Sequence, residues 1–156
     1  MTKHILISIS VLGSLVLFGC GGGMPADPDL TCDSAATAKT LTGEVQAVFT
    51  AKCVSCHVSG YAYGDYTTAD ATFASTTNKP SYLAQQVMGS TLKVVDGANK
   101  SLANSSLWLK VLGGDAANKK GPKGEGTLGA MPNDGTTLTA DQKKLLKDWI
   151  CTGGAK

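Results

Sequence analysis

Five consecutive residues constrain this chain more than any other feature of its sequence. They are Cys53-Val54-Ser55-Cys56-His57, in which two cysteines enclose two residues and a histidine follows directly. Two thiols at this spacing can each add to one vinyl group of a haem, and the next residue then presents its imidazole to the iron. The motif therefore predicts one covalently attached haem c, with Cys53 and Cys56 as attachment points and His57 as an iron ligand.

Other chemistries also use closely spaced cysteines. A thioredoxin-like redox pair lies at the start of a helix, where the helix dipole lowers the thiol pKa, whereas Cys53 follows a predicted helix. A structural zinc site needs about four ligands, and this motif supplies three with no second Cys or His pair nearby. A chance occurrence in a loop is the remaining alternative. The other histidine of the chain is His4, which lies in a predicted leader, so one chain cannot supply two histidines to a haem.

The first 19 residues have the pattern of a secretory signal. A charged start precedes an apolar run over residues 5–18, which is too short to span about 30 Å of hydrocarbon. The run ends in Leu17-Phe18-Gly19-Cys20, which resembles a bacterial lipobox, where a peptidase cuts before the cysteine and lipid is attached to it. We therefore predict a signal peptide (1–19), a lipidated Cys20 with a flexible tether (20–39) and a folded domain (40–156). An ordinary signal with an incidental cysteine is the alternative.

This leader predicts an exported protein on the periplasmic side or at the cell surface. It is held by lipid at a bacterial membrane, with the outer membrane favoured. Several acyl chains on one cysteine would make a firm anchor.

The folded part has the pattern of short helices joined by long loops rich in Gly, Asn, Asp, Thr and Ser. Apolar residues at helical spacing predict a mostly α domain, and a large apolar cofactor would supply the centre that short helices lack. The last helix carries a capping box, Thr139-x-x-Gln142, and stops before Gly153. The predicted helices cover about 42–52, 80–88, 105–112 and the segment after Thr139.

These features together resemble the class I c-type cytochromes over roughly residues 41–154. Phe49 stands four residues before Cys53, where that family has an aromatic contact between crossing terminal helices, and Trp149 stands on the other side. Gly129-Ala130-Met131-Pro132 matches the loop of the family's distal methionine ligand. The resemblance implies short helices around one covalent haem, His57 and Met131 as axial ligands, and a single-electron carrier that is not an enzyme.

Met131 also suits this role on its own chemistry. A thioether is a soft, neutral ligand that stabilises ferrous iron, and Met131 lies in a loop framed by Gly and Pro. Core packing is the alternative for Met131, and Met88 is the other candidate ligand. Rival functions are a haem enzyme or electron-accepting subunit of peroxidase-like type, and a haem-based ligand sensor in which Met131 is displaced.

Two cysteines, Cys32 and Cys151, remain after lipid and haem have been assigned. In an oxidising compartment they most simply form a disulfide, and a crossing of the terminal helices would bring them together. Two free buried thiols or an intermolecular bridge are the alternatives.

Charge and composition restrict the partners. The net charge is only +2, and all 14 basic residues are lysines, which argues against nucleic-acid binding. We expect redox proteins as donor and acceptor, a membrane reached through the lipid, and no small-molecule substrate. The lysines of one Gly-rich loop could steer an acidic partner or simply be solvated, and three tyrosines after the motif could pack on haem, bond a propionate or pack in their loop. These residues are Lys119, Lys120 and Lys123, and Tyr61, Tyr63 and Tyr66.

Overall fold

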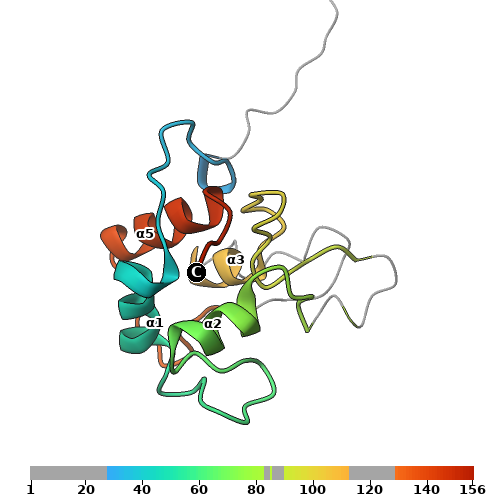
Figure 1. Cartoon of the computed structure of the whole chain (residues 1–156). Helices are drawn as coiled ribbons and strands as arrows, with labels where there is room; N and C mark the ends of the chain where they lie inside the picture. The colour runs from blue at the N-terminus through green and yellow to red at the C-terminus, as the bar shows by residue number, and fades with distance from the viewer. Residues whose placement is uncertain (1–27, 83–84, 86–89, 113–128) are drawn as a thin grey trace, which may run out of the picture.

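The computed structural model describes residues 28–82, 85, 90–112 and 129–156. Its regular elements are helical, and strand pairing within these ranges is limited to isolated bridges. Figure 1 shows the short helices gathered around a common centre with long connections between them. In chain order they are a 3-10 turn η1 (Pro28–Leu30), a π-helical turn η2 (Leu41–Val45), and the α-helices α1 (Gln46–Lys52), α2 (Ala69–Thr76), α3 (Ser106–Leu112) and α5 (Ala140–Cys151).

The first predicted helix is present as η2 followed by α1. The backbone at Gly43 departs from helical angles (φ −93°, ψ −129°), so the regular α-helix begins only at Gln46. Leu41, Val45 and Phe49 are buried because they repeat at helical spacing and face the core.

The last predicted helix is confirmed as α5. The Thr139 side chain accepts the Gln142 N–H, and the Gln142 side chain accepts the Thr139 N–H, which completes the predicted capping box. The expected aromatic contact between the two ends of the domain is also present. The rings of Phe49 and Trp149 meet edge to face with centroids 5.9 Å apart, so α1 and α5 share one core.

The third predicted helix is confirmed as α3, and its preceding loop is held by isolated backbone bridges. Lys93 pairs with both Pro80 and Ser105, and Thr77 pairs with Val95. The predicted helix over 80–88 is wrong for its first residues, because Pro80 pairs with Lys93 in an isolated bridge instead of starting a helix. Helix-type bonds appear later, where the Gln85 N–H bonds to the Ser81 and Tyr82 carbonyls, both at 3.3 Å. Residues 83–84 and 86–89, including Met88, lie outside the described residues.

Helix α2 lies in a segment for which the sequence predicted only loop. Thr68 caps it by accepting the Ala71 N–H, and Asp70 stands in its first turn. The helix buries Thr72 and Thr76 instead of aliphatic side chains, so it has no apolar periodicity that a sequence pattern could reveal.

No helix in the described ranges is long and apolar enough to cross a membrane.

Candidate functional site

The Cys-x-x-Cys-His motif forms a tight turn directly after α1. Cys53 is the C-cap of α1, and its N–H bonds to the Phe49 carbonyl at 2.8 Å. The N–H groups of Cys56 and His57 then both bond to the Cys53 carbonyl, at 3.1 and 2.9 Å. This turn places both thiols and the imidazole within one helical turn of each other.

The two motif thiols are not joined to one another. Cys53 is half-buried and Cys56 is exposed. Burial, with a smaller contribution from the nearby Cys56, raises the pKa of the Cys53 thiol to about 11. A thioredoxin-like pair needs a lowered pKa at a helix N-terminus, whereas Cys53 ends a helix and keeps its proton. The structure therefore argues against a disulfide-exchange site.

The zinc alternative also lacks support. Within the described parts of the chain, no three His, Cys, Asp or Glu side chains are grouped so that they could hold a metal ion. The motif residues thus gain no further protein ligand of these types there.

The His57 imidazole has a defined tautomer. Its Nδ1 lies 3.3 Å from the Gly64 carbonyl oxygen, and because a carbonyl can only accept, Nδ1 carries the proton. Nε2 then has a free lone pair, as in metal-binding histidines that are oriented by a backbone carbonyl. Burial lowers the pKa of His57, and the Lys110 charge lowers it further, while the Gly64 hydrogen bond acts in the opposite direction. These effects favour the neutral imidazole that a metal requires.

Met131 is fixed to the last turn of α3. Its backbone N–H donates to the Lys110 carbonyl at 3.0 Å, and its side chain is half-buried. The same Lys110 acts electrostatically on His57. Lys110 thus bonds to the Met131 backbone and is near enough to His57 for its charge to act on the imidazole. Burial lowers the pKa of Lys110.

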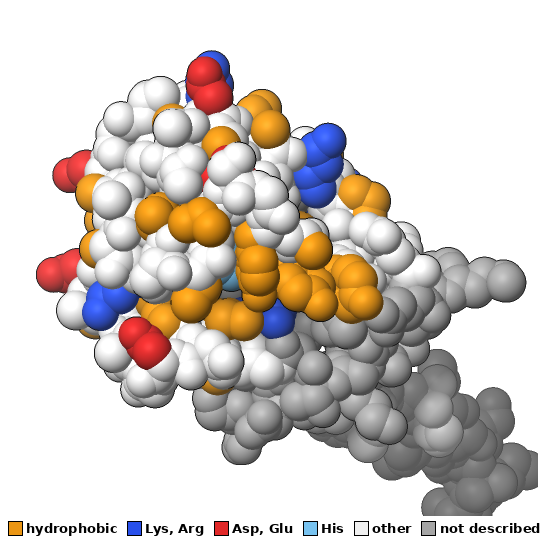
Figure 2. Space-filling view, turned by 90° about the horizontal axis from the view of Figure 1, so that it is seen from below, with side chains coloured by type: hydrophobic (Ala, Val, Ile, Leu, Met, Phe, Trp, Pro, Cys, Tyr) orange, Lys and Arg blue, Asp and Glu red, His pale blue; other side chains and the backbone are white. Residues whose placement is uncertain are grey.

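The surface around the histidine is largely apolar. In Figure 2 a small part of a histidine side chain (pale blue) is visible between hydrophobic side chains (orange), and a lysine side chain (blue) lies nearby. His57 is the histidine within the described ranges. An apolar surface beside an imidazole suits an apolar group with few polar contacts.

Two of the three tyrosines that follow the motif contact this histidine. The Tyr66 ring stacks on the His57 ring, and the Tyr61 ring meets it edge to face. Tyr63 contacts Tyr61 and Tyr82 instead. The sequence pointed to these tyrosines but not to Gly64 or Lys110, because the contacts of Gly64 and Lys110 with His57 form only after loop 58–66 has folded back and α3 has packed.

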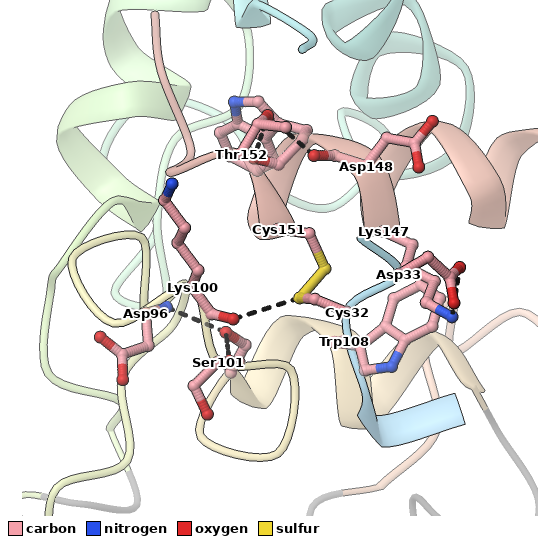
Figure 3. The surroundings of a disulfide bond; sticks show 12 residues. Cys32, Asp33, Asp96, Lys100, Ser101, Trp108, Lys147, Asp148, Cys151 and Thr152 are labelled. Carbon is pink, nitrogen blue, oxygen red and sulfur yellow. Dashed lines mark hydrogen bonds and ion pairs between the residues drawn. A yellow bond between two sulfur atoms is a disulfide. The ribbon is translucent and has the colours of Figure 1, made fainter. Parts of the chain in front are cut away.

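The predicted disulfide is present between Cys32 and Cys151, with Cα atoms 5.4 Å apart. Figure 3 shows it joining the N-terminal segment to the end of α5. The Cys32 Sγ lies 3.2 Å from the Lys100 carbonyl oxygen, a contact in which neither atom carries a proton. The bond lies at the opposite end of α5 from its capping box.

The segment around this bond differs from the predicted tether. The Trp108 indole N–H donates to the Asp29 carbonyl at 2.6 Å, and Lys147 pairs with Asp33 at 3.3 Å. Leu30 and Ala36 pack against the buried core. The folded unit therefore begins at least ten residues before residue 40, because this segment has its own apolar contacts. Cys20, residues 1–19 and Lys119, Lys120 and Lys123 lie outside the described residues.

No protein-family model, no curated protein and no solved structure matches this chain.

Proposed function

We propose that the chain is an exported, lipid-anchored monohaem c-type cytochrome that carries one electron at a time between redox proteins. The observation that carries this proposal is the arrangement of the motif: two thiols outside any disulfide beside an imidazole whose Nδ1 lies against the Gly64 carbonyl, which leaves Nε2 as the unprotonated nitrogen. Redox exchange and zinc binding, the other chemistries of this motif, have no structural support in the described ranges.

The residues present fit a haem. Cys53 and Cys56 would form the thioether bonds, and His57 would bind the iron through Nε2. Met131, held against α3 by its own N–H, would supply the second axial ligand. The haem, when bound, supplies an iron that cycles between the ferrous and ferric states.

The chain's own contribution is to hold these ligands and exclude water. The Gly64 carbonyl fixes the imidazole tautomer, and the buried rings of Phe49 and Tyr66 provide a dry wall behind the motif. A neutral thioether and a neutral imidazole favour ferrous iron more than two imidazoles would. With His57 and Met131 both bound to the iron, no coordination position would remain for a substrate, and the chain would act as a carrier and not as an enzyme.

Covalent attachment is tested by producing the full chain in a host that matures c-type cytochromes and extracting it with acidic acetone. The haem stays on the unaltered protein, and Cys53→Ala or Cys56→Ala weakens its retention. Cys32→Ser serves as the matched control, because Cys32 belongs to the disulfide and its loss leaves the haem attached. Complete extraction of haem from the unaltered protein contradicts the proposal.

Axial ligation by Met131 separates the carrier from the rival enzyme and sensor. The unaltered ferrous protein is six-coordinate, low-spin and inert to carbon monoxide. Met131→Ala opens one position, binds carbon monoxide and lowers the reduction potential, because ferrous iron loses its soft ligand. Rapid carbon monoxide binding by the unaltered protein would favour the sensor.

Export and anchoring rest on the leader and on the disulfide, which is typical of an oxidising compartment. Cys20→Ala releases a protein that still carries haem, because the anchor and the cofactor use different cysteines. Deletion of residues 1–19 yields apoprotein, because haem is attached outside the cytoplasm in this class. A Cys20→Ala protein that stays in the membrane fraction contradicts the lipid anchor.

A further inference from the structure

Two tyrosines of one loop hold the His57 imidazole from two directions. The Tyr66 ring stacks on it with centroids 4.4 Å apart and planes 13° from parallel. The Tyr61 ring meets it at 5.1 Å and 88°. A face contact and an edge contact on the same ring restrict its rotation more than either contact alone.

Tyr66 is itself fixed by the core. It is only 4% exposed, and its ring meets Phe49 edge to face at 5.1 Å. Its backbone N–H donates to the His57 carbonyl at 3.0 Å, and its own carbonyl accepts from Gln46 Nε2 at 2.9 Å. The plane of the Tyr66 ring is therefore set by α1 and transmitted to the imidazole through the stack.

The hydrogen bond to Gly64 does not achieve this on its own. At 3.3 Å it is long for an N–H···O bond, and one hydrogen bond fixes a direction without fixing the plane of the ring. The stacked face of Tyr66 supplies the missing constraint.

We propose that Tyr66 is a positioning residue that sets the orientation of the His57 imidazole plane about its Nε2–iron axis. This inference rests on the proposed haem function. The imidazole plane governs overlap with the iron d orbitals, so its angle determines the ferric g anisotropy and the pattern of haem-methyl NMR shifts. Residues beyond the ligands commonly fix ligand orientation in metal sites.

The test compares ferric EPR and haem-methyl NMR spectra of holoprotein variants. Tyr66→Phe keeps the ring and leaves both spectra unchanged. Tyr66→Leu removes the ring, and it shifts the g values and reorders the methyl resonances. The matched control is Tyr63→Leu, in the same loop and 48% exposed, which contacts Tyr61 and Tyr82 and leaves the spectra unchanged. A purely structural role for Tyr66 lowers stability without moving these spectra, and that result overturns the inference.

A second measurement needs no variant and covers the case in which Tyr66→Leu fails to fold. In the diamagnetic ferrous protein, ring protons of Tyr66 and His57 give nuclear Overhauser contacts. Their absence overturns the stack and the inference with it. Unchanged spectra in a Tyr66→Leu protein that retains covalent haem contradict only the role of Tyr66, whereas an unaltered chain without haem contradicts the proposed function and therefore both.

Discussion

At the scale of single residues, Gly64 combines a positive φ with a close approach to two side chains. Its φ is +117°, and an added Cβ would lie 2.9 Å from Tyr66 Cε1 and 3.2 Å from Ser75 Cβ. We expect Gly64→Ala to lower the free energy of unfolding by about 2–4 kcal/mol, from backbone strain plus overpacking. Urea denaturation of the variant measures this.

Gly60→Ala is the matched control for Gly64→Ala. Gly60 also has a positive φ, +84°, but an added Cβ meets nothing within 4 Å. We therefore expect only the backbone cost, about 1 kcal/mol. Equal losses in the two variants would show that Tyr66 and Ser75 yield freely to the new methyl group.

The carboxylate of Asp96 makes the stability of the fold depend on pH in the acid range. Its nearly buried carboxylate accepts hydrogen bonds from Asn104, Asn99 and Lys93 at 2.8–3.0 Å. Burial acts to raise the pKa of Asp96, but these hydrogen bonds and the Lys93 charge outweigh it and lower the pKa below its ordinary value of 3.8. The unfolded chain therefore takes up this proton first. The stabilisation is complete above about pH 4 and disappears as the pH falls through the lower folded pKa.

We expect Asp96→Asn to lower the free energy of unfolding by about 3 kcal/mol at pH 7, because an amide N–H₂ would face other donors. The deficit relative to the unaltered protein should shrink as the pH falls from 5 to 2. Urea titrations of both proteins at several pH values measure it. A deficit that stays constant over this range would show that Asp96 does not titrate below its usual pKa.

Some residues of the candidate site could be predicted from a local sequence pattern, and others could not. The thiols and imidazole share five consecutive residues, and Met131 stands in a loop framed by Gly and Pro, so the sequence could propose each of them. The Gly64 carbonyl, the Tyr66 face and the Lys110 charge reach His57 only after loop 58–66 and α3 have packed. No spacing in the sequence encodes those distances.

At the scale of elements, whether a helix can be predicted from the sequence depends on which side chains it buries. α5 combines a capping box with an apolar face, so both local signals agree and the prediction is confirmed. α2 buries two threonines, and a period of polar residues is invisible to a hydrophobic pattern. The expected helix does not begin at Pro80, because the long-range bridge between Pro80 and Lys93 outweighs the local preference of proline for a first helical position.

The α5 cap gives a prediction at this scale. Thr139→Ala removes the hydroxyl that accepts the Gln142 N–H at 3.2 Å and should lower the free energy of unfolding by about 1 kcal/mol. The exposed Thr137, two residues earlier, is the matched control. Thr137→Ala should change the free energy of unfolding by less than about 0.5 kcal/mol. Thermal or urea unfolding of both variants checks the difference. Equal effects would mean that the cap adds nothing beyond an exposed hydroxyl.

At the scale of the whole molecule, the N-terminal segment belongs to the folded unit. Asp29, Cys32 and Asp33 each contact α3 or α5, so a tether from a lipidated Cys20 would comprise only residues 21–27. Extended, that length reaches about 25–30 Å. If Cys20 carries the proposed lipid, this shorter tether would hold the domain closer to the membrane than a tether of residues 20–39 would.

The disulfide that fastens this segment gives the last prediction. Cys32 and Cys151 are 119 residues apart, so the bond removes a large loop-closure entropy from the unfolded chain, up to about 5 kcal/mol. We expect the double variant Cys32→Ser/Cys151→Ser to lose a free energy of unfolding of that order and to lose hydrogen-exchange protection at the Trp108 indole, which donates to Asp29. Covalent haem should remain, because Cys53 and Cys56 lie outside this bond.

Asp33→Asn separates the covalent bond from its neighbours. This substitution breaks the adjacent ion pair with Lys147 but leaves the disulfide intact. Because the Asp33 side chain is 69% exposed, the loss should lower the free energy of unfolding by less than about 1 kcal/mol. If the double serine variant is no less stable than Asp33→Asn, or if Cys32 and Cys151 in the native protein react with an alkylating agent, the segment is held by its side-chain contacts alone. In that case a reducing environment would leave the position of the domain relative to its anchor unchanged, whereas an intact disulfide makes that position depend on the redox state of the compartment.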